Sequence, residues 1–220
     1  MKKLIIFDMD GVIFDAPDFW LNLHKAYGTI KEGSELTKKY LKTDYEMLVK
    51  EVVGRLWKNK PADVYFKMID ESKYMPGAVE TLKVLKSRGY KIAIISSGPW
   101  DLAERAKKDA DIDYVYAHKL VIENGKVAGS TDMRNWPIRH GNKGEIMKKL
   151  CEEHNIDYKD CIVVCNGDND IKMARTAGLA IAFCPVEEEI KKYCNILIET
   201  KDLTLILKPI ENFEMSEIAF

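Results

Sequence analysis

The chain has 220 residues, of which 46% are apolar and 31% charged, and its formal net charge at pH 7 is −1. This composition is that of a globular protein rather than a disordered one, and the length allows one large core or a core domain with a smaller inserted one. The nearly balanced charge excludes the positive field of a nucleic-acid-binding protein, and no apolar run reaches the roughly 20 residues that span a bilayer, so we expect a cytoplasmic protein that binds neither nucleic acid nor membrane.

The first predicted element is a buried strand that ends in two carboxylates. Four apolar residues in a row, 4–7, are typical of a strand buried on both faces, and Asp8, Asp10 and Gly11 follow it. Acids held close together at the edge of a parallel sheet are costly unless a cation or a proton compensates them, which favours a divalent metal site. The same pattern also occurs in turns and calcium loops, so a structural role stays open for the motif alone.

Residues 16–74 carry helical patterns where a second strand would be expected. Apolar spacing predicts helices around 20–27, 36–41, 45–56 and 64–69. We expect turns or helix starts at Pro17, Gly28, Gly33 and Pro61. Because a crossover between parallel strands needs only about a dozen residues, the insertion should be a helical cap domain, with residues 1–15 and 75–220 forming the core domain.

The remaining sequence alternates strands with helices. Strands are predicted at 90–95, 114–117, 161–165, 179–183 and 195–198; helices are predicted at 78–87, 100–108, 146–154, 171–176 and 203–207. A hairpin with an Asn-Gly turn is expected around Asn124, and the last ten residues either fray or dock through Phe213 and Phe220. This alternation predicts an α/β fold built on a doubly wound parallel sheet. Five cysteines without a Cys-x-x-Cys pair indicate neither disulfides nor a zinc site.

Polar residues follow the predicted core strands and open one helix. After Asp8 and Asp10 come Ser96, Ser97 and Gly98, then Lys143, then Asn166, Asp168, Asn169 and Asp170. Strand ends on one edge of a parallel sheet converge on a single crevice, so the set is more specific than any member. The alternatives are helix capping for the serines, Asn169 and Asp170, and a solvated position for Lys143.

Each residue type suits phosphoryl transfer. Asp8 could attack phosphorus, and Asp10 could protonate the leaving oxygen and later take a proton from water. Mg²⁺ with oxygen ligands would screen the anions that must meet. The Ser96 hydroxyl, the backbone around Ser97 and the Lys143 ammonium would bind phosphoryl oxygens. The four histidines show no ligand spacing and are interpreted as structural or surface residues.

Taken together, four segments resemble the motifs of the haloacid dehalogenase-like hydrolases, and they are most similar to the phosphoserine phosphatase group. The segments are 7–11, 94–98, 142–145 and 166–173. The resemblance implies a Rossmann-like core with a helical cap, and a magnesium-dependent phosphatase that hydrolyses a small phosphorylated metabolite through an aspartyl-phosphate. By this resemblance the catalytic residues would be Asp8 and Asp10, the substrate and phosphate contacts Gly11, Ser96, Ser97, Gly98, Lys143 and Asn169, and the Mg²⁺ ligands Asp8, Asp10, Asn166 and Asp170.

Two features depart from that family pattern. Asn166 stands where the fourth motif usually has its first aspartate, and the loss of one negative charge should weaken magnesium binding. An alternative alignment gives Asp168 the ligand role. In the cap, Pro17 lies about where phosphoserine phosphatases carry a glutamate for the substrate ammonium, and Arg55 is one helical turn from the place of their carboxylate-binding arginine. The substrate therefore stays open, and so do a phosphomutase and a catalytically weak metabolite-binding protein. Trp20, Tyr27 and Trp57 suggest an aromatic lid surface.

Overall fold

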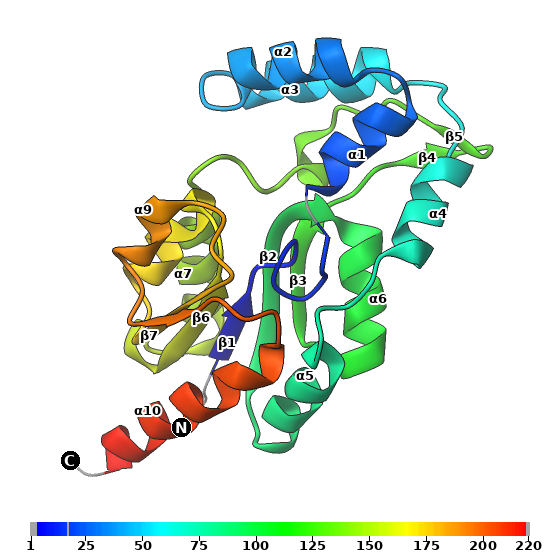
Figure 1. Cartoon of the computed structure of the whole chain (residues 1–220). Coiled ribbons are helices and arrows are strands. Elements are labelled where there is room, and N and C mark those ends of the chain that lie inside the picture. The colour runs from blue at the N-terminus through cyan, green and yellow to red at the C-terminus, as the bar shows by residue number, and fades with distance from the viewer. Residues whose placement is uncertain (1–3, 17, 219–220) are drawn as a thin grey trace.

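A six-stranded parallel sheet forms the centre of the protein, whose computed structural model describes residues 4–16 and 18–218 (Figure 1). The expectations for Pro17 and Phe220 lie outside the described residues. The strand order is β3-β2-β1-β6-β7-β8. The strands are β1 (Leu4–Phe7), β2 (Lys91–Pro99), β3 (Tyr114–His118), β6 (Cys161–Cys165), β7 (Leu179–Phe183) and β8 (Ile196–Ile198). The predicted α/β fold with a doubly wound parallel sheet is confirmed.

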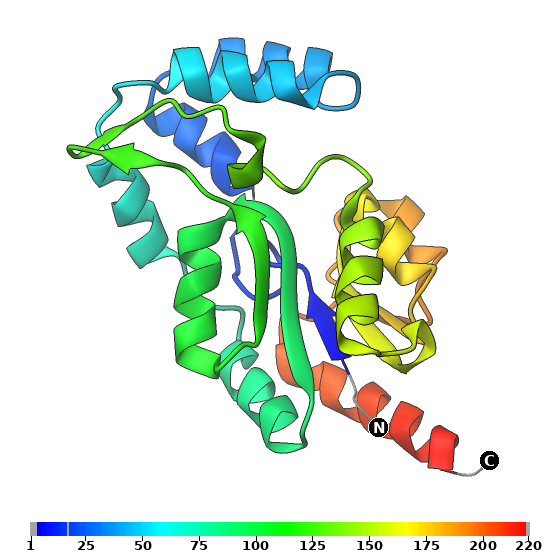
Figure 2. The same ribbon diagram turned by 180° about the vertical axis from the view of Figure 1, so that it is seen from behind.

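Helices cover both faces of this sheet (Figures 1 and 2). One face carries α5 (Ala78–Ser87), α6 (Trp100–Ala110) and α10 (Leu207–Ile218); the other carries α7 (Lys143–His154), α8 (Ile171–Ala174) and α9 (Glu188–Lys191). In β1, Ile5 and Phe7 pack into one core cluster, and Leu4 and Ile6 pack into the other. Burial on both faces explains why β1 is an uninterrupted apolar run.

The helices predicted for residues 16–74 lie above the carboxyl ends of the strands (Figure 1). They are α1 (Phe19–Ala26), α2 (Ile30–Tyr40), α3 (Tyr45–Glu51), η1 (Val52–Leu56) and α4 (Asp63–Glu71). The predicted helix at 45–56 changes geometry part-way, because η1 is a turn of π-helix. The expectation of a turn at Gly33 is wrong: Gly33 lies inside α2, where an added Cβ would come within 2.2 Å of the His24 ring. Glycine there lets α2 pack directly against that imidazole.

The predicted hairpin connects the core with the helices above it. Its strands are β4 (Ile122–Glu123) and β5 (Lys126–Val127), joined at Asn124 and Gly125, which both have positive φ. The Ala62 N–H donates to the Gly125 carbonyl, and the Asn59 N–H to the Val127 carbonyl, both at 2.9 Å. A segment from the second half of the chain thus extends the helical layer, which the sequence pattern did not predict.

Short turns and the last helix complete the fold. The 3₁₀ segments are η2 (Met133–Asn135), η3 (Tyr158–Asp160), η4 (Asp168–Asp170) and η5 (Leu203–Ile206). The predicted final helix at 203–207 begins as η5 and continues as α10, and Phe213 packs against the core, so the alternative of docking through Phe213 is confirmed. In the described part of the chain, every helix is too short or too polar to cross a membrane.

Candidate active site

The site forms where β1 lies between β2 and β6, at the centre of the sheet. The chain leaves β1 toward β2 and returns on the other side as β6, which opens a crevice at the carboxyl ends of these strands. The Asp8 N–H continues the β6 ladder by donating to the Val164 carbonyl at 2.9 Å. Gly11 follows with a φ of +76°, and an added Cβ would lie 2.4 Å from Asn166 Nδ2. Glycine therefore lets the loop after β1 close on the loop after β6.

Lys143 joins two of the strand ends through a buried ion-pair network. Its Nζ lies 2.9 Å from Asp8 Oδ1 and 2.7 Å from Asp170 Oδ1, and its side chain is only 2% exposed. Burial alone would lower the pKa of Lys143, but the carboxylates of Asp170 and Asp8 raise it above the ordinary lysine value. The ammonium is therefore a fixed positive charge beside Asp8. Lys143 is the first residue of α7, where the helix dipole disfavours a cation. Its ion pairs with the two carboxylates offset this unfavourable interaction.

Asp170 holds both the lysine and the loop after β6. Its Oδ2 accepts the backbone N–H groups of Asn166, at 3.3 Å, and Gly167, at 3.2 Å. Burial and the nearby Asp8 raise the pKa of Asp170 to about 6, against the opposing effect of Lys143, so the group is ionised at neutral pH. With both oxygens occupied, the geometry favours Asp170 as a positioning residue for Lys143 over direct coordination of a metal.

Asp10 is a buried acid with a raised pKa. Burial, Asp8 and Asp18 raise the pKa of Asp10 to about 8, although Lys143 and the Phe19 N–H act in the other direction. Among the described residues, nothing forms a hydrogen bond to its Oδ1. A carboxylic acid with a raised pKa, two residues beyond Asp8, is suited to give its proton to a leaving oxygen.

The end of β2 closes over this acid. β2 continues to Pro99, beyond the predicted end at residue 95, and its register with β3 shifts after Ile95. The buried Ser96 hydroxyl accepts the Gly98 N–H at 3.0 Å. The Gly98 N–H, which was expected to bind a phosphoryl oxygen, is therefore already paired. An added Cβ at Gly98 would lie 2.4 Å from Met9 Cε and 3.2 Å from Asp10 Oδ2, so this close approach requires glycine.

The loop after β6 brings Asn166 to the site and leaves Asp168 outside it. Asn166 lines the cavity, is 6% exposed, and its Nδ2 donates to the Asp10 carbonyl at 3.0 Å. Asn169 also lines the cavity, and its Oδ1 accepts the Gly141 N–H at 2.8 Å. Asp168 is exposed, and its N–H donates to Glu187. The geometry therefore favours the alignment that puts Asn166 in the place of the family's aspartate.

Comparisons with known proteins identify the family to which the chain belongs. The family model described as haloacid dehalogenase-like hydrolase matches residues 2–178. The chain belongs to the haloacid dehalogenase-like hydrolases. A phosphoserine phosphatase of Methanocaldococcus jannaschii is 34% identical over 96% of this chain and 98% of its own length, and one of Lactococcus lactis is 27% identical over 98% and 99%. A solved phospho-aspartyl intermediate analogue of phosphoserine phosphatase superposes with a TM-score of 0.78 at 33% identity, covering 94% of this chain and 98% of that one.

These relatives make the chain a phosphoric monoester hydrolase of the phosphoserine phosphatase-like kind. Phosphatases of the haloacid dehalogenase-like family in general use a divalent metal. Among the residues that the structure describes, no three His, Cys, Asp or Glu side chains have the geometry of a metal site. The oxygens at the strand ends are of mixed kind instead: the Asp8 carboxylate, the Asn166 amide and the Asp10 backbone carbonyl. These oxygens suit a hard divalent cation, with one carboxylate fewer than the family pattern. To bind it, the Asn166 amide must release the Asp10 carbonyl, to which its Nδ2 donates in this structure.

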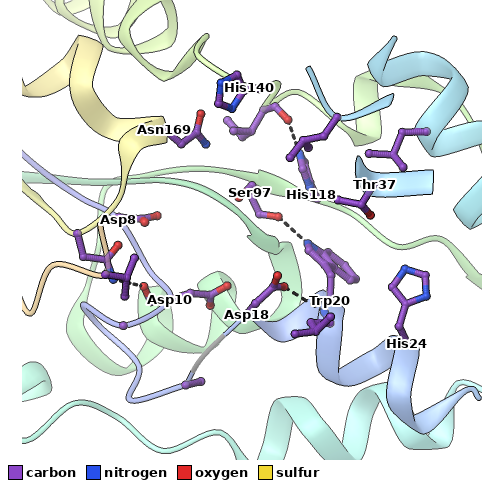
Figure 3. A pocket seen from close by; sticks show the side chains of 18 of the residues that line it. Asp8, Asp10, Asp18, Trp20, His24, Thr37, Ser97, His118, His140 and Asn169 are labelled. Carbon is purple, nitrogen blue, oxygen red and sulfur yellow. Dashed lines mark hydrogen bonds between the residues drawn. The ribbon is translucent and has the colours of Figure 1, made fainter. Parts of the chain in front are cut away.

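A cavity of about 720 Å³ extends from Asp8 to the underside of the helical layer (Figure 3). Trp20 lies near its middle, where Nε1 donates to the Ser97 carbonyl at 2.6 Å. Beyond Trp20 the cavity reaches Trp57 and His118, and Trp136 closes it from the loop before α7. The suggestion of an aromatic lid surface is consistent with this lining for Trp20 and Trp57, but Tyr27 does not line the cavity, and its hydroxyl donates to the Pro61 carbonyl at 2.8 Å. No sequence pattern indicated His118 and Trp136 in the lining, because only the fold brings them here.

The charged residues that could bind an amino-acid substrate have partners within the protein: Asp15 and Asp18 line the cavity, whereas Arg55 does not. Arg55 pairs with Glu32 at 2.6 Å and Glu51 at 2.7 Å, with its side chain 48% exposed. Asp18 caps α1 by accepting the Leu21 N–H, and Asp15 pairs with Lys201 at 2.6 Å.

Proposed function

We propose that the protein is a magnesium-dependent phosphatase that hydrolyses a phosphorylated metabolite through an aspartyl-phosphate on Asp8. The observation that carries this proposal is the Lys143 ammonium fixed 2.9 Å from Asp8 Oδ1, with the buried acid Asp10 two residues further along the chain. Likeness to a phosphoserine phosphatase whose phospho-aspartyl intermediate analogue is known supports the covalent step.

The residues divide the reaction into two displacements. In the first, an Asp8 oxygen forms a bond to phosphorus, the ester P–O bond breaks, and the leaving oxygen takes the Asp10 proton. In the second, water gives a proton to the Asp10 carboxylate and attacks phosphorus, which releases phosphate and restores Asp8. Lys143 stabilises the charge that spreads over the phosphoryl oxygens, and the Ser96 hydroxyl at the end of β2 would add a hydrogen-bond donor. A Mg²⁺ held by Asp8, Asn166 and the Asp10 carbonyl would reduce the electrostatic repulsion between the phosphate and the Asp8 carboxylate that attacks it.

We further propose that residues 16–74 form a cap over this site, with residues 1–15 and 75–220 as the core. The position of α1 to α4 above the strand ends supports this division (Figure 1). Helices α1 to α3 and η1 contribute most of the apolar lining of the cavity. The bonds between Gly125 and Ala62 suggest that the hairpin acts together with this cap.

Hydrolysis of p-nitrophenyl phosphate, with Mg²⁺ and with excess chelator, tests the proposal. We expect turnover that depends on the metal and is lost, by at least a thousandfold, in Asp8→Asn. The matched control Asp168→Asn removes an exposed carboxylate outside the cavity and should keep its activity. Phosphate binding without turnover in the wild type would instead favour the metabolite-binding protein, and a requirement for a bisphosphate activator would favour the phosphomutase.

A further inference from the structure

We propose that the cap half of the cavity selects phosphate esters whose leaving group is a largely apolar alcohol that bears a ring and no negative charge. This inference rests on the proposed phosphatase function and names the substrate class of that site. It is carried by the lining of the cavity, the pairing of the nearby charges, the local geometry of η1 and one unpartnered polar atom.

The first observation is the chemistry of the lining. From α1 to Trp57, the side chains that face the cavity are aliphatic, aromatic or neutral polar. The described residues of this stretch contribute no charge to the lining, since burial lowers the pKa of His24 and keeps its ring neutral. The apolar part is made by residues such as Leu41, Leu48, Val49 and Val53. A surface of this kind binds ligands by removing apolar area from water.

The second observation is the pairing of the cations that line the cavity. Arg139 lies 3.5 Å from Glu46, and Lys201 lies 2.6 Å from Asp15. The further acids Asp18 and Glu187 also line the cavity and would repel an anionic leaving group. The carboxylate of an amino acid would therefore lose its hydration without gaining a free cation, which is costly in an apolar cavity.

The third observation is the shape of the lining. η1 is a π-helical turn, a geometry that often occurs at functional sites, and it directs the consecutive residues Val52 and Val53 to the cavity. Trp20 stacks on Trp57 with ring centroids 5.6 Å apart and lies 5.7 Å from the Trp136 ring. This cluster of aromatic rings lines the cavity and suits contact with a ring in the leaving group.

The fourth observation is an unpartnered donor in the same wall. Trp136 is 4% exposed, and its Nε1 has no hydrogen-bond partner among the described residues. A buried indole N–H usually finds an acceptor, so a ligand that supplies one uncharged acceptor would satisfy it. The cavity volume of about 720 Å³ also leaves room for a leaving group larger than serine.

Three esters of primary alcohols test this class without differing much in leaving-group reactivity: ethyl phosphate, 2-phenylethyl phosphate and O-phosphoserine. We expect kcat/KM for 2-phenylethyl phosphate to exceed that of the other two by at least tenfold. Leu41→Lys, at a half-buried position of the lining, should lower the ratio of kcat/KM for 2-phenylethyl phosphate to that for ethyl phosphate at least fivefold. The control Leu205→Lys changes an exposed leucine outside the cavity and should alter none of the three.

A preference for O-phosphoserine, or equal rates for all three esters, would overturn the inference while leaving the phosphatase function intact. Failure of the function gives a different result, because no ester, including p-nitrophenyl phosphate, would be hydrolysed. Calorimetric titration of the wild-type protein with 2-phenylethylphosphonate and ethylphosphonate then tests the cavity by binding alone. Tenfold tighter binding of the phenyl compound supports the inference, and equal affinities contradict it.

Discussion

Asn166 gives this site one negative charge fewer than the family pattern, which has an aspartate at this position. Its amide contacts the Asp10 carbonyl at 3.0 Å and lines the cavity, while the Asp8 carboxylate beside it is already paired with Lys143. A divalent cation held here would meet less negative charge than in a site with two free carboxylates. Magnesium affinity should therefore be limited by charge and not by the number of oxygens.

Asn166→Asp should strengthen Mg²⁺ binding by about tenfold, because it adds a carboxylate at nearly the same volume next to the cation. Isothermal titration of the protein with MgCl₂ measures this directly. Asp168→Asn serves as the control, since it removes an exposed charge only two residues away. If Asn166→Asp left the affinity unchanged and Asp168→Asn weakened it, the alternative alignment would be correct.

At the scale of single residues, the sequence predicts those site residues that the ends of the strands bring together. Asp8 and Asn166 directly follow buried strands and Asp10 lies two residues after Asp8, so their meeting follows from a parallel sheet. The bond between Asp170 and Lys143 was not predictable, because it depends on the rotamers of two side chains from separate helical turns. Trp136 lies in an irregular stretch without periodicity, and only the fold brings it to the cavity.

Among the elements, α2 shows how a glycine inside a helix can serve packing. Alanine normally stabilises a helix interior by about 1 kcal/mol relative to glycine. At Gly33, however, an added Cβ would lie 2.2 Å from His24 Cε1, and the ring is held by Thr29 at 2.8 Å. The clash should exceed the gain in helix propensity.

Gly33→Ala should therefore lower the free energy of unfolding by about 1–2 kcal/mol, measured by urea denaturation. Lys38→Ala, at an exposed position of the same helix, should be nearly neutral. In the double variant with His24→Ala, the added methyl group should cost much less, because the ring is gone. A stabilised Gly33→Ala protein would show that α2 can move away from His24 freely.

The elements themselves were largely predictable, since buried strands and amphipathic helices have strong periods. The π-helical turn η1 was not, because a periodic apolar pattern does not distinguish it from the α-helix it continues. The association of the hairpin with the helical layer was also not predictable from the sequence. Backbone hydrogen bonds such as that from Ala62 to Gly125 join segments about sixty residues apart in the sequence. Long-range pairing of this kind has no local signal.

For the molecule as a whole, His118 lies where the sheet, the helical layer and the loop before α7 meet. It ends β3, its Nε2 donates to the Ile138 carbonyl at 2.8 Å, and the Tyr45 hydroxyl of α3 lies 3.3 Å away. The ring is 2% exposed and packs 5.0 Å from the Trp136 ring. Protonation of this imidazole would place a charge among apolar neighbours at the junction of all three parts.

Burial lowers the pKa of His118 to about 4, helped by the charge of Lys143 and opposed by the Ile138 and Ser97 carbonyls. An unfolded histidine titrates near 6.5, so between these values the unfolded state binds the extra proton and the native state does not. The contribution of His118 to stability is therefore complete above pH 6.5 and is lost as the pH falls toward 4. From pH 7.5 to 5.0 this loss amounts to about 2 kcal/mol.

Urea denaturation at these two pH values should show a fall in the free energy of unfolding that is smaller in His118→Gln than in the wild type by about 2 kcal/mol. Only the difference between the two proteins is informative, because Asp10 and Asp170 also have shifted pKa values and titrate in both. His140→Gln removes an exposed imidazole and should keep the wild-type pH dependence. Equal pH dependence in His118→Gln and the wild type would mean that the folded protein opens at this junction and lets the imidazole take up its proton in water.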